Sequence, residues 1–292
     1  MDRVERKPNR TYVRKYTKKY VKRKWKTLKL NETAVLRKSN DVVVPEEYEA
    51  IGKEAFRKCQ ITSITLPYGL KEIGEDAFRK SMYLKEVKLP NSVIRLGNGC
   101  FAECCVLHSI TMSDKLKEIP ENAFDQDKWL LEVHFTKNSQ IQRINNSAFY
   151  ECTRLESIQL PPKLTEIGDW AFRRCRELKH VKFPKGLKTI GMKAFYFCGL
   201  ESLELPDTVE VLGPKAFYCC KQLTEVKLPE SIRILDRSVF HGCSRLKVLE
   251  IRHDPEFIGE EIVNSGTHIR CYQGSKVDAY CQEHGYITEY IE

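Results

Sequence analysis

Apolar and polar residues follow one pattern that repeats along most of the chain. A buried-type phenylalanine recurs in the string "IGEDAFRKS" (residues 73–81) and in eight similar strings, at steps of 22, 23, 23, 25, 23, 23, 22 and 23 residues. The recurring residues are Phe56, Phe78, Phe101, Phe124, Phe149, Phe172, Phe195, Phe217 and Phe240. Near-equal periods of this length are typical of a solenoid, in which each period forms one coil that stacks on its neighbours.

The first part of each period predicts a short strand. It reads L-x-x-[IVL]-x-[LIF], often followed by proline, as in "LKEVKLP" from Leu84 and "LTEVKLP" from Leu223. Its last two apolar positions alternate with polar ones, which is the pattern of a strand with one buried face. Proline ends the strand because it has no N–H for continued pairing. The fixed offset of these segments predicts parallel strands lying side by side.

The second part of each period predicts a tight turn. Gly after Ile permits a sharp bend, and the small Ala beside Phe suits a short helical turn. A cysteine stands three residues after Phe in seven of the nine periods, and Ser81 and Asp127 replace it in the other two. We therefore expect the phenylalanines and the cysteines to stack in two columns through the interior.

The combined pattern L-x-x-I-x-L-P-x-x-L-x-x-I-G-x-x-A-F-x-x-C, over roughly residues 42–251, resembles the BspA-like or Treponema-type leucine-rich repeats. The tail from Ile269 resembles the carboxy-terminal cap of that family. The resemblance implies an α/β solenoid, a leucine-rich-repeat horseshoe with one long parallel β-sheet, short helical turns on the other side and capped ends. It also implies binding or adhesion, without catalysis or a cofactor.

Charge divides the chain into an arm and a body. The net charge of +9 arises in the first thirty residues, which hold thirteen lysines and arginines against two acidic residues. Tyr12, Tyr16 and Tyr20 would form one stripe of a helix there, so a capping helix or a solvated tail is the favoured interpretation. The alternative is an arm that binds nucleic acid or an anionic membrane surface. Its candidate contacts are Arg14, Lys15, Lys18, Lys19, Lys22 and Arg23.

Signals for chemistry are sparse. The chain has no G-x-S-x-G, P-loop, H-E-x-x-H or EF-hand string, so we predict that it is not an enzyme. His268, Cys271, Cys281 and His284 have spacings compatible with zinc, but buried thiols are the favoured interpretation and we predict no metal site. The twelve cysteines are expected to be reduced core thiols, with disulfides between adjacent coils as the alternative.

The predicted strands offer one surface for a partner. Outward positions on successive strands alternate in charge at Lys182, Glu204, Lys227 and Glu250, so much of this face compensates its own charge. Aromatic residues lie instead near the Ala-Phe pairs, where burial between coils is the favoured interpretation and a binding patch is the alternative. The candidate partner-facing residues are Glu132, His134, Gln159, His180, Lys182, Trp170, Tyr196 and Tyr218.

These observations predict three parts and one main function. Residues 1–41 form a basic arm or cap, residues 42–254 the repeat solenoid and residues 255–292 a carboxy-terminal cap. We expect a non-enzymatic scaffold for protein–protein interaction or adhesion, with an unidentified protein partner and no transmembrane segment. Anionic-polymer binding by the arm is the alternative. Without an apolar signal segment the chain is expected in the cytoplasm if Met1 is its native start, and otherwise at the cell surface or secreted.

Overall fold

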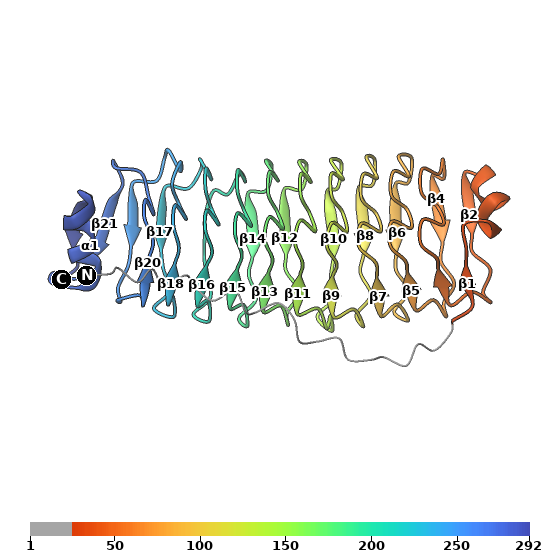
Figure 1. Cartoon of the computed structure of the whole chain (residues 1–292), viewed down its shortest axis with the longest axis horizontal. Coiled ribbons are helices and arrows are strands. Elements are labelled where there is room, and N and C mark those ends of the chain that lie inside the picture. The colour runs from red at the N-terminus through yellow and green to blue at the C-terminus, as the bar shows by residue number, and fades with distance from the viewer. Residues whose placement is uncertain (1–24) are drawn as a thin grey trace, which may run out of the picture.

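The chain folds into a long stack of coils. The computed structural model describes residues 25–292, which form a parallel β-solenoid of about eleven turns. Figure 1 shows the coils stacked along one straight axis, from β2 (Asp41–Val43) near one end to α1 (Lys276–His284) at the other. The predicted solenoid is confirmed, whereas the curvature of a horseshoe is not.

One row of strands forms where the L-x-x-I-x-L segments predict it, and we call the side of the solenoid that carries these strands the strand face. Partners lie in parallel register, as in Ser157↔His180. The segment from Leu200 to Leu205 occupies the same place in its coil without forming a strand. The strands after β2 are β4 (Ser63–Thr65), β6 (Glu86–Lys88), β8 (Ser109–Thr111), β10 (Glu132–His134), β12 (Ser157–Gln159), β14 (His180–Lys182), β17 (Glu225–Lys227), β19 (Val248–Glu250) and β21 (His268–Cys271).

The prediction of one long sheet is wrong, because each coil carries a second strand. Two residues, the second of them Ile or Leu, pair with the same positions in the next coil, and both rows together divide into six sheets. This Ile or Leu is buried in every second-row strand except the last, so two residues suffice for a strand here. The second row, visible along the lower side of Figure 1, comprises β1 (Thr27–Leu28), β3 (Ala50–Ile51), β5 (Glu72–Ile73), β7 (Arg95–Leu96), β9 (Glu118–Ile119), β11 (Arg143–Ile144), β13 (Glu166–Ile167), β15 (Thr189–Ile190), β16 (Val211–Leu212), β18 (Ile234–Leu235) and β20 (Phe257–Ile258).

The Ala-Phe strings form turns that are not helical, contrary to the prediction. The residues two before and two after each Phe have positive φ, for example +57° at Glu54 and +53° at Lys58. Left-handed residues at these two places turn alternate N–H groups toward the next coil. Phe56 N–H thus donates to Ala77 O at 2.7 Å, and Lys58 N–H donates to Arg79 O at 2.8 Å. The Ala-Phe turns form a third side of the solenoid, beside the two rows of strands. Hydrogen bonds between coils hold this side together, as they hold the two rows of strands together.

The glycine after Ile is required for a different reason from the predicted bend. A Cβ added to Gly74 would lie 2.8 Å from the carbonyl carbon of Gly52 in the preceding coil, and one added to Gly97 would lie 2.3 Å from Glu75 N. Neither glycine has positive φ. Adjacent coils approach so closely at this step that a side chain would force their backbones apart.

The predicted phenylalanine column is confirmed. All nine rings are fully buried, and each stacks on the next with centroids 5.0–5.7 Å apart and planes within 12°. Offset-stacked aromatic pairs contribute about 0.5–1.5 kcal/mol each beyond their buried area. The column is thus a continuous stabilising spine rather than a set of separate core residues.

The cysteine column packs as predicted and adds hydrogen bonds that the sequence did not indicate. All twelve cysteines are free thiols. In six coils the Sγ–H donates to the carbonyl of the phenylalanine in the preceding coil, as from Cys198 to Phe172 O at 3.0 Å. Ser81 Oγ makes the equivalent bond to Phe56 O at 2.6 Å. Burial raises the pKa of Cys243 to about 12, so such thiols stay protonated and serve as donors.

Both ends of the described chain carry additional elements. The short 3-10 helices η1 (Glu32–Ala34) and η2 (Leu36–Lys38) lie at the first coils. At the other end, α1 begins with a Ser275 cap and ends at the left-handed Gly285, and β22 (Ile287–Tyr290) follows as the last strand.

No helix within residues 25–292 has the length and apolar content needed to cross a membrane. The exact limits of arm, solenoid and cap stay predictions.

Candidate functional site

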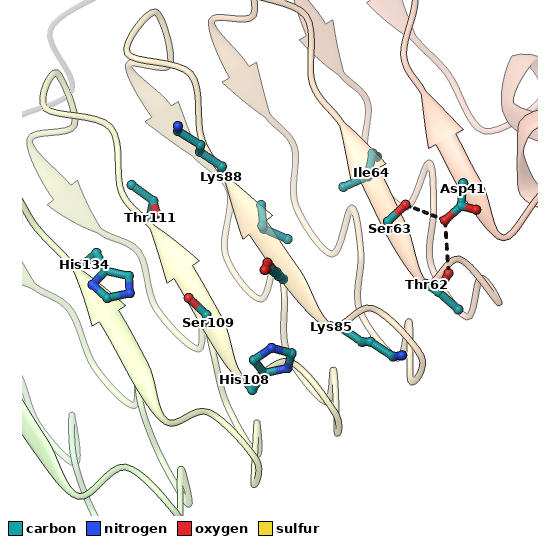
Figure 2. Close-up of a pocket in the computed structure, with 12 residues that line it drawn as sticks. Asp41, Thr62, Ser63, Ile64, Lys85, Lys88, His108, Ser109, Thr111 and His134 are labelled. Carbon is teal, nitrogen blue, oxygen red and sulfur yellow. Dashed lines mark hydrogen bonds between the residues drawn. The ribbon is translucent and has the colours of Figure 1, made fainter.

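A groove lies on the strand face over the first five strands of its row. It has a volume of about 630 Å³. Figure 2 shows Lys85 and His108 near the starts of their strands and Lys88, Thr111 and His134 toward the strand ends. The remaining lining residues are Asp41, Thr62, Ser63, Ile64, Glu86, Val87 and Ser109.

The groove follows from the alternation of long and short side chains on neighbouring strands. β6 and β10 carry exposed Glu86, Lys88, Glu132 and His134, which stand up as ridges. Between them β8 carries only short hydroxyl side chains, which are half-buried. The register places Ser109 beside both glutamates and Thr111 beside both Lys88 and His134. A shallow trough lined by hydroxyl groups therefore runs between two charged ridges.

Most polar side chains of this groove have no partner within the protein. Six side chains of the groove form no side-chain hydrogen bond and no ion pair with any of residues 25–292. They are Lys85, Glu86, Lys88, His108, Ser109 and Thr111. They come from two neighbouring coils and meet water in the hollow. Ligand groups that offer both donors and acceptors could replace that water.

The rim of the groove is internally bonded. Asp41 accepts hydrogen bonds from Ser63 Oγ at 2.6 Å and from Thr62 Oγ1 at 3.4 Å, as drawn in Figure 2. His134 Nε2 lies 2.9 Å from Glu132 Oε2 on its own strand. These contacts fix the two ends of the hollow, so its middle is the part left open for a ligand.

Toward the carboxy terminus the strand face is committed to its own contacts. Glu250 is buried, and its carboxylate lies 2.6 Å from Arg252, 3.3 Å from Arg270 and 3.5 Å from Lys227. Burial alone would raise the pKa of Glu250, but the hydrogen bonds from Arg252 and Arg270 outweigh it and hold that pKa below its usual range. The predicted charge compensation therefore holds for Lys227 and Glu250.

The predicted aromatic candidates lie on the Ala-Phe turns and not in the groove. Tyr196 stacks on Tyr218 with centroids 5.0 Å apart, and Tyr218 stacks on His241 at 5.6 Å. The Arg173 guanidinium lies 5.2 Å from the Tyr196 ring centroid. Arg173 and the stacked neighbours therefore cover the faces of Tyr196 and Tyr218. Trp170 occupies the left-handed position of the same row of turns.

The structure thus brings together only part of the predicted site. His134 lines one end of the groove and Glu132 stands beside it on β10, whereas Gln159, His180 and Lys182 lie on strands beyond it. The basic candidates Arg14 to Arg23 lie outside the described residues. Sequence reasoning missed most of the groove, because it weighed each strand alone. The signal that could have found it is the alternation of Ser-Ile-Thr strands with Glu-Val-Lys and Glu-Val-His strands. The lining residues absent from the predicted site include Asp41, Thr62, Lys85, Lys88, His108, Ser109 and Thr111.

The possible zinc ligands of the cap are engaged in other contacts. His268 Nδ1 lies 2.7 Å from Glu289 Oε1, and His284 Nδ1 lies 3.0 Å from Tyr280 O. Cys271 and Cys281 are buried between α1 and the last strands. In the part of the chain that the structure describes, no three His, Cys, Asp or Glu side chains are placed to hold one metal ion.

Several solved structures are similar to this chain at low identity. A leucine-rich repeat protein from Bacteroides ovatus is 22% identical, with 88% of this chain and 85% of that chain covered and a TM-score of 0.45. The pneumococcal vaccine antigen PcpA is 16% identical, with 87% and 79% covered and a TM-score of 0.49. A leucine rich cell surface protein from Faecalibacterium prausnitzii is 22% identical, with 87% and 88% covered and a TM-score of 0.45.

Family membership rests on the repeats themselves. No curated protein matches the chain. The BspA type leucine rich repeat region matches in six copies, over residues 36–149 and 142–269. These matches cover well over half of the chain and contain the phenylalanine spine, most of both rows of strands and the groove. The chain therefore belongs to the BspA type leucine rich repeat family.

Proposed function

We propose that the chain is a non-enzymatic scaffold for protein interaction or adhesion, and that it engages its partner through the groove on the strand face. The observation that carries this proposal is the group of six polar side chains without internal partners, gathered in one hollow. At the carboxy-terminal end of the face, by contrast, Glu250 is paired within the protein with three cations. A partner would gain most by contacting the groove.

The groove has the chemistry of binding rather than catalysis. Nucleophilic catalysis needs a hydroxyl or thiol within hydrogen-bond reach of a base that a third group orients. Ser109 and Thr111 donate to no base among the described residues, and the His134 ring is directed to Glu132. The groove is also open along its length, so water would reach any reacting group.

Site-specific photocrosslinking tests this proposal. A photoreactive residue at Thr111, within the groove, is expected to give a discrete adduct in cells that express the chain. The same residue at Thr189, on β15 of the second row of strands, is the matched control and should give none. Adducts of equal yield from both positions, or from Thr189 alone, would place the partner elsewhere and contradict the proposal.

The other expected roles stay predictions. Binding of an anionic polymer through the basic arm involves residues outside the described part of the chain. Cytoplasm and cell surface also both remain predicted compartments.

A further inference from the structure

The groove offers a partner many hydrogen-bonding side chains and few apolar ones. Its free groups are two hydroxyls, one imidazole, two ammonium groups and one carboxylate, while Ile64 and Val87 are its only apolar lining residues. Protein partners usually anchor through aromatic or apolar side chains in desolvated pockets, and drug-like ligands also need largely apolar walls. This hollow provides neither. Its groups suit a ligand that is rich in hydroxyls along its whole length.

Two lysines of the groove are free to meet acidic groups of a ligand. Lys85 and Lys88 have no ion-pair partner among the described residues, and Glu86 between them is equally free. Asp41 keeps its negative charge while it accepts from Thr62 and Ser63, but it lies two strands away on β2, so the acidic groups of a ligand would lie over β6 instead. The two lysines flank Glu86 on β6, so a ligand carboxylate can meet either ammonium group while Glu86 accepts from ligand hydroxyls.

The spacing of the two charged ridges favours a ligand that lies across the strands, along the axis of the solenoid. Neighbouring strands lie about 4.8 Å apart, so Lys88 and His134, two strands apart, are separated by roughly 10 Å along the solenoid axis. The chain continues this alternation, with a basic residue type at the same strand position in every second coil: Lys88, His134, Lys182, Lys227 and Arg270. Of these, Lys88 and His134 line the hollow. A ligand lying across the strands would meet one such side chain per two coils.

We propose that the groove binds an extended acidic oligosaccharide, with a uronic-acid carboxylate on alternate sugars, lying across β4 to β10. This assignment rests on the proposed scaffold function in its adhesion form, and it names the chemistry of the group that a partner presents to the groove. Sugar hydroxyls meet Ser109, Thr111 and His108 in the trough, and carboxylates meet Lys85 or Lys88 on the ridge. Each sugar spans a distance comparable with the strand spacing, which lets one chemistry repeat along the groove.

Titration of the full chain with a hyaluronan tetrasaccharide, which at one sugar per strand spans β4 to β10, tests the proposal. Calorimetry should show saturable binding that weakens as salt is added, because exposed charge pairs are screened. Lys88→Gln should weaken binding by about tenfold, the usual effect of losing one hydrogen bond to a charged group. Lys182→Gln is the matched control, because Lys182 is equally exposed on the same face, has no ion pair and lies outside the groove; it should change affinity by less than about twofold.

Two comparison ligands decide the chemical class. A neutral oligosaccharide of equal length and an acidic peptide of equal charge should both bind at least about tenfold more weakly. Equal binding of either one, equal effects of the two substitutions, or no binding of the tetrasaccharide would overturn the proposal. If the tetrasaccharide fails while Thr111 still gives its crosslinked adduct, only the ligand class is wrong. If both fail, the scaffold function of this groove is wrong as well.

Discussion

Asp127 is the residue at which the repeat departs most from its own rule. It occupies the position that cysteine holds in seven of nine coils, yet its carboxyl group has no exposed surface. One oxygen accepts from Cys104 N–H at 2.7 Å, and the other has no partner among the described residues. Burial raises the pKa of Asp127 well above its usual range, and the nearby carboxylates of Asp125 and Glu103 raise it further. The folded coil therefore favours the protonated acid.

The protonation of Asp127 in the folded protein should affect how the free energy of unfolding depends on pH. Because the folded pKa of Asp127 lies above the unfolded value of about 3.9, its contribution is fully present below pH 4 and is lost as pH rises toward the folded pKa. Asp127→Cys removes the titrating group. Denaturant unfolding should show little gain in stability at pH 4 and a gain that grows by up to about 1.4 kcal/mol per pH unit above it.

Ser81→Cys is the control for this column. Ser81 already donates to Phe56 O, so its replacement should leave the pH dependence of the unfolding free energy unchanged. A constant difference between Asp127→Cys and the parent chain from pH 4 to pH 7 would mean that Asp127 is ionised in the folded protein.

At the scale of the element, the Ile-Gly step and the Ala-Phe turn set how closely coils stack. Gly74→Ala places a methyl group 2.8 Å from two backbone atoms of the preceding coil, where no flexible side chain can move aside. We expect a loss of about 1–3 kcal/mol in the free energy of unfolding, the usual cost of overpacking. Gly69→Ala is the matched control, since a Cβ at Gly69 meets no atom within 4 Å. Equal effects of the two substitutions would show that spacing between coils does not require Gly74.

The sequence predicted where the strands of the first row lie but not the second row or the form of the turns. The L-x-x-I-x-L segments alternate buried and exposed residues, and that pattern reports directly on a strand. The two-residue strands at Glu72–Ile73 and its equivalents are too short for any alternation to show. The string around Ala77-Phe78 contains good helix formers, but its hydrogen bonds go to the next coil, and a sequence of one coil carries no sign of that partner.

The groove could not be predicted from the pattern within single repeats either. A hollow exists only where short side chains of one coil lie between long side chains of its neighbours, so it is a property of three coils in register. Ser109 and Thr111 look unremarkable in their own repeat. They become functional candidates once the register places them between Glu86 and Glu132 and between Lys88 and His134.

At the scale of the whole molecule, each coil contacts only its neighbours, so stability should be close to a sum of terms for coils and for the contacts between them. The phenylalanine spine is the clearest such term. Phe149 stacks on Phe124 and Phe172, whereas Phe56 has one ring neighbour among the described residues, Phe78. Phe149→Leu therefore removes two stacked pairs, and Phe56→Leu removes one.

Phe149→Leu should lower the free energy of unfolding by about 1–3 kcal/mol beyond the change in buried area, and Phe56→Leu by about half as much, since each pair contributes about 0.5–1.5 kcal/mol. Hydrogen exchange should locate the effect. Amides of the coils that contain Phe124, Phe149 and Phe172 should exchange faster in Phe149→Leu, while those near Phe240 keep their protection. A uniform increase in every coil would mean that the solenoid opens as a single cooperative unit, with coupling that reaches far beyond adjacent coils.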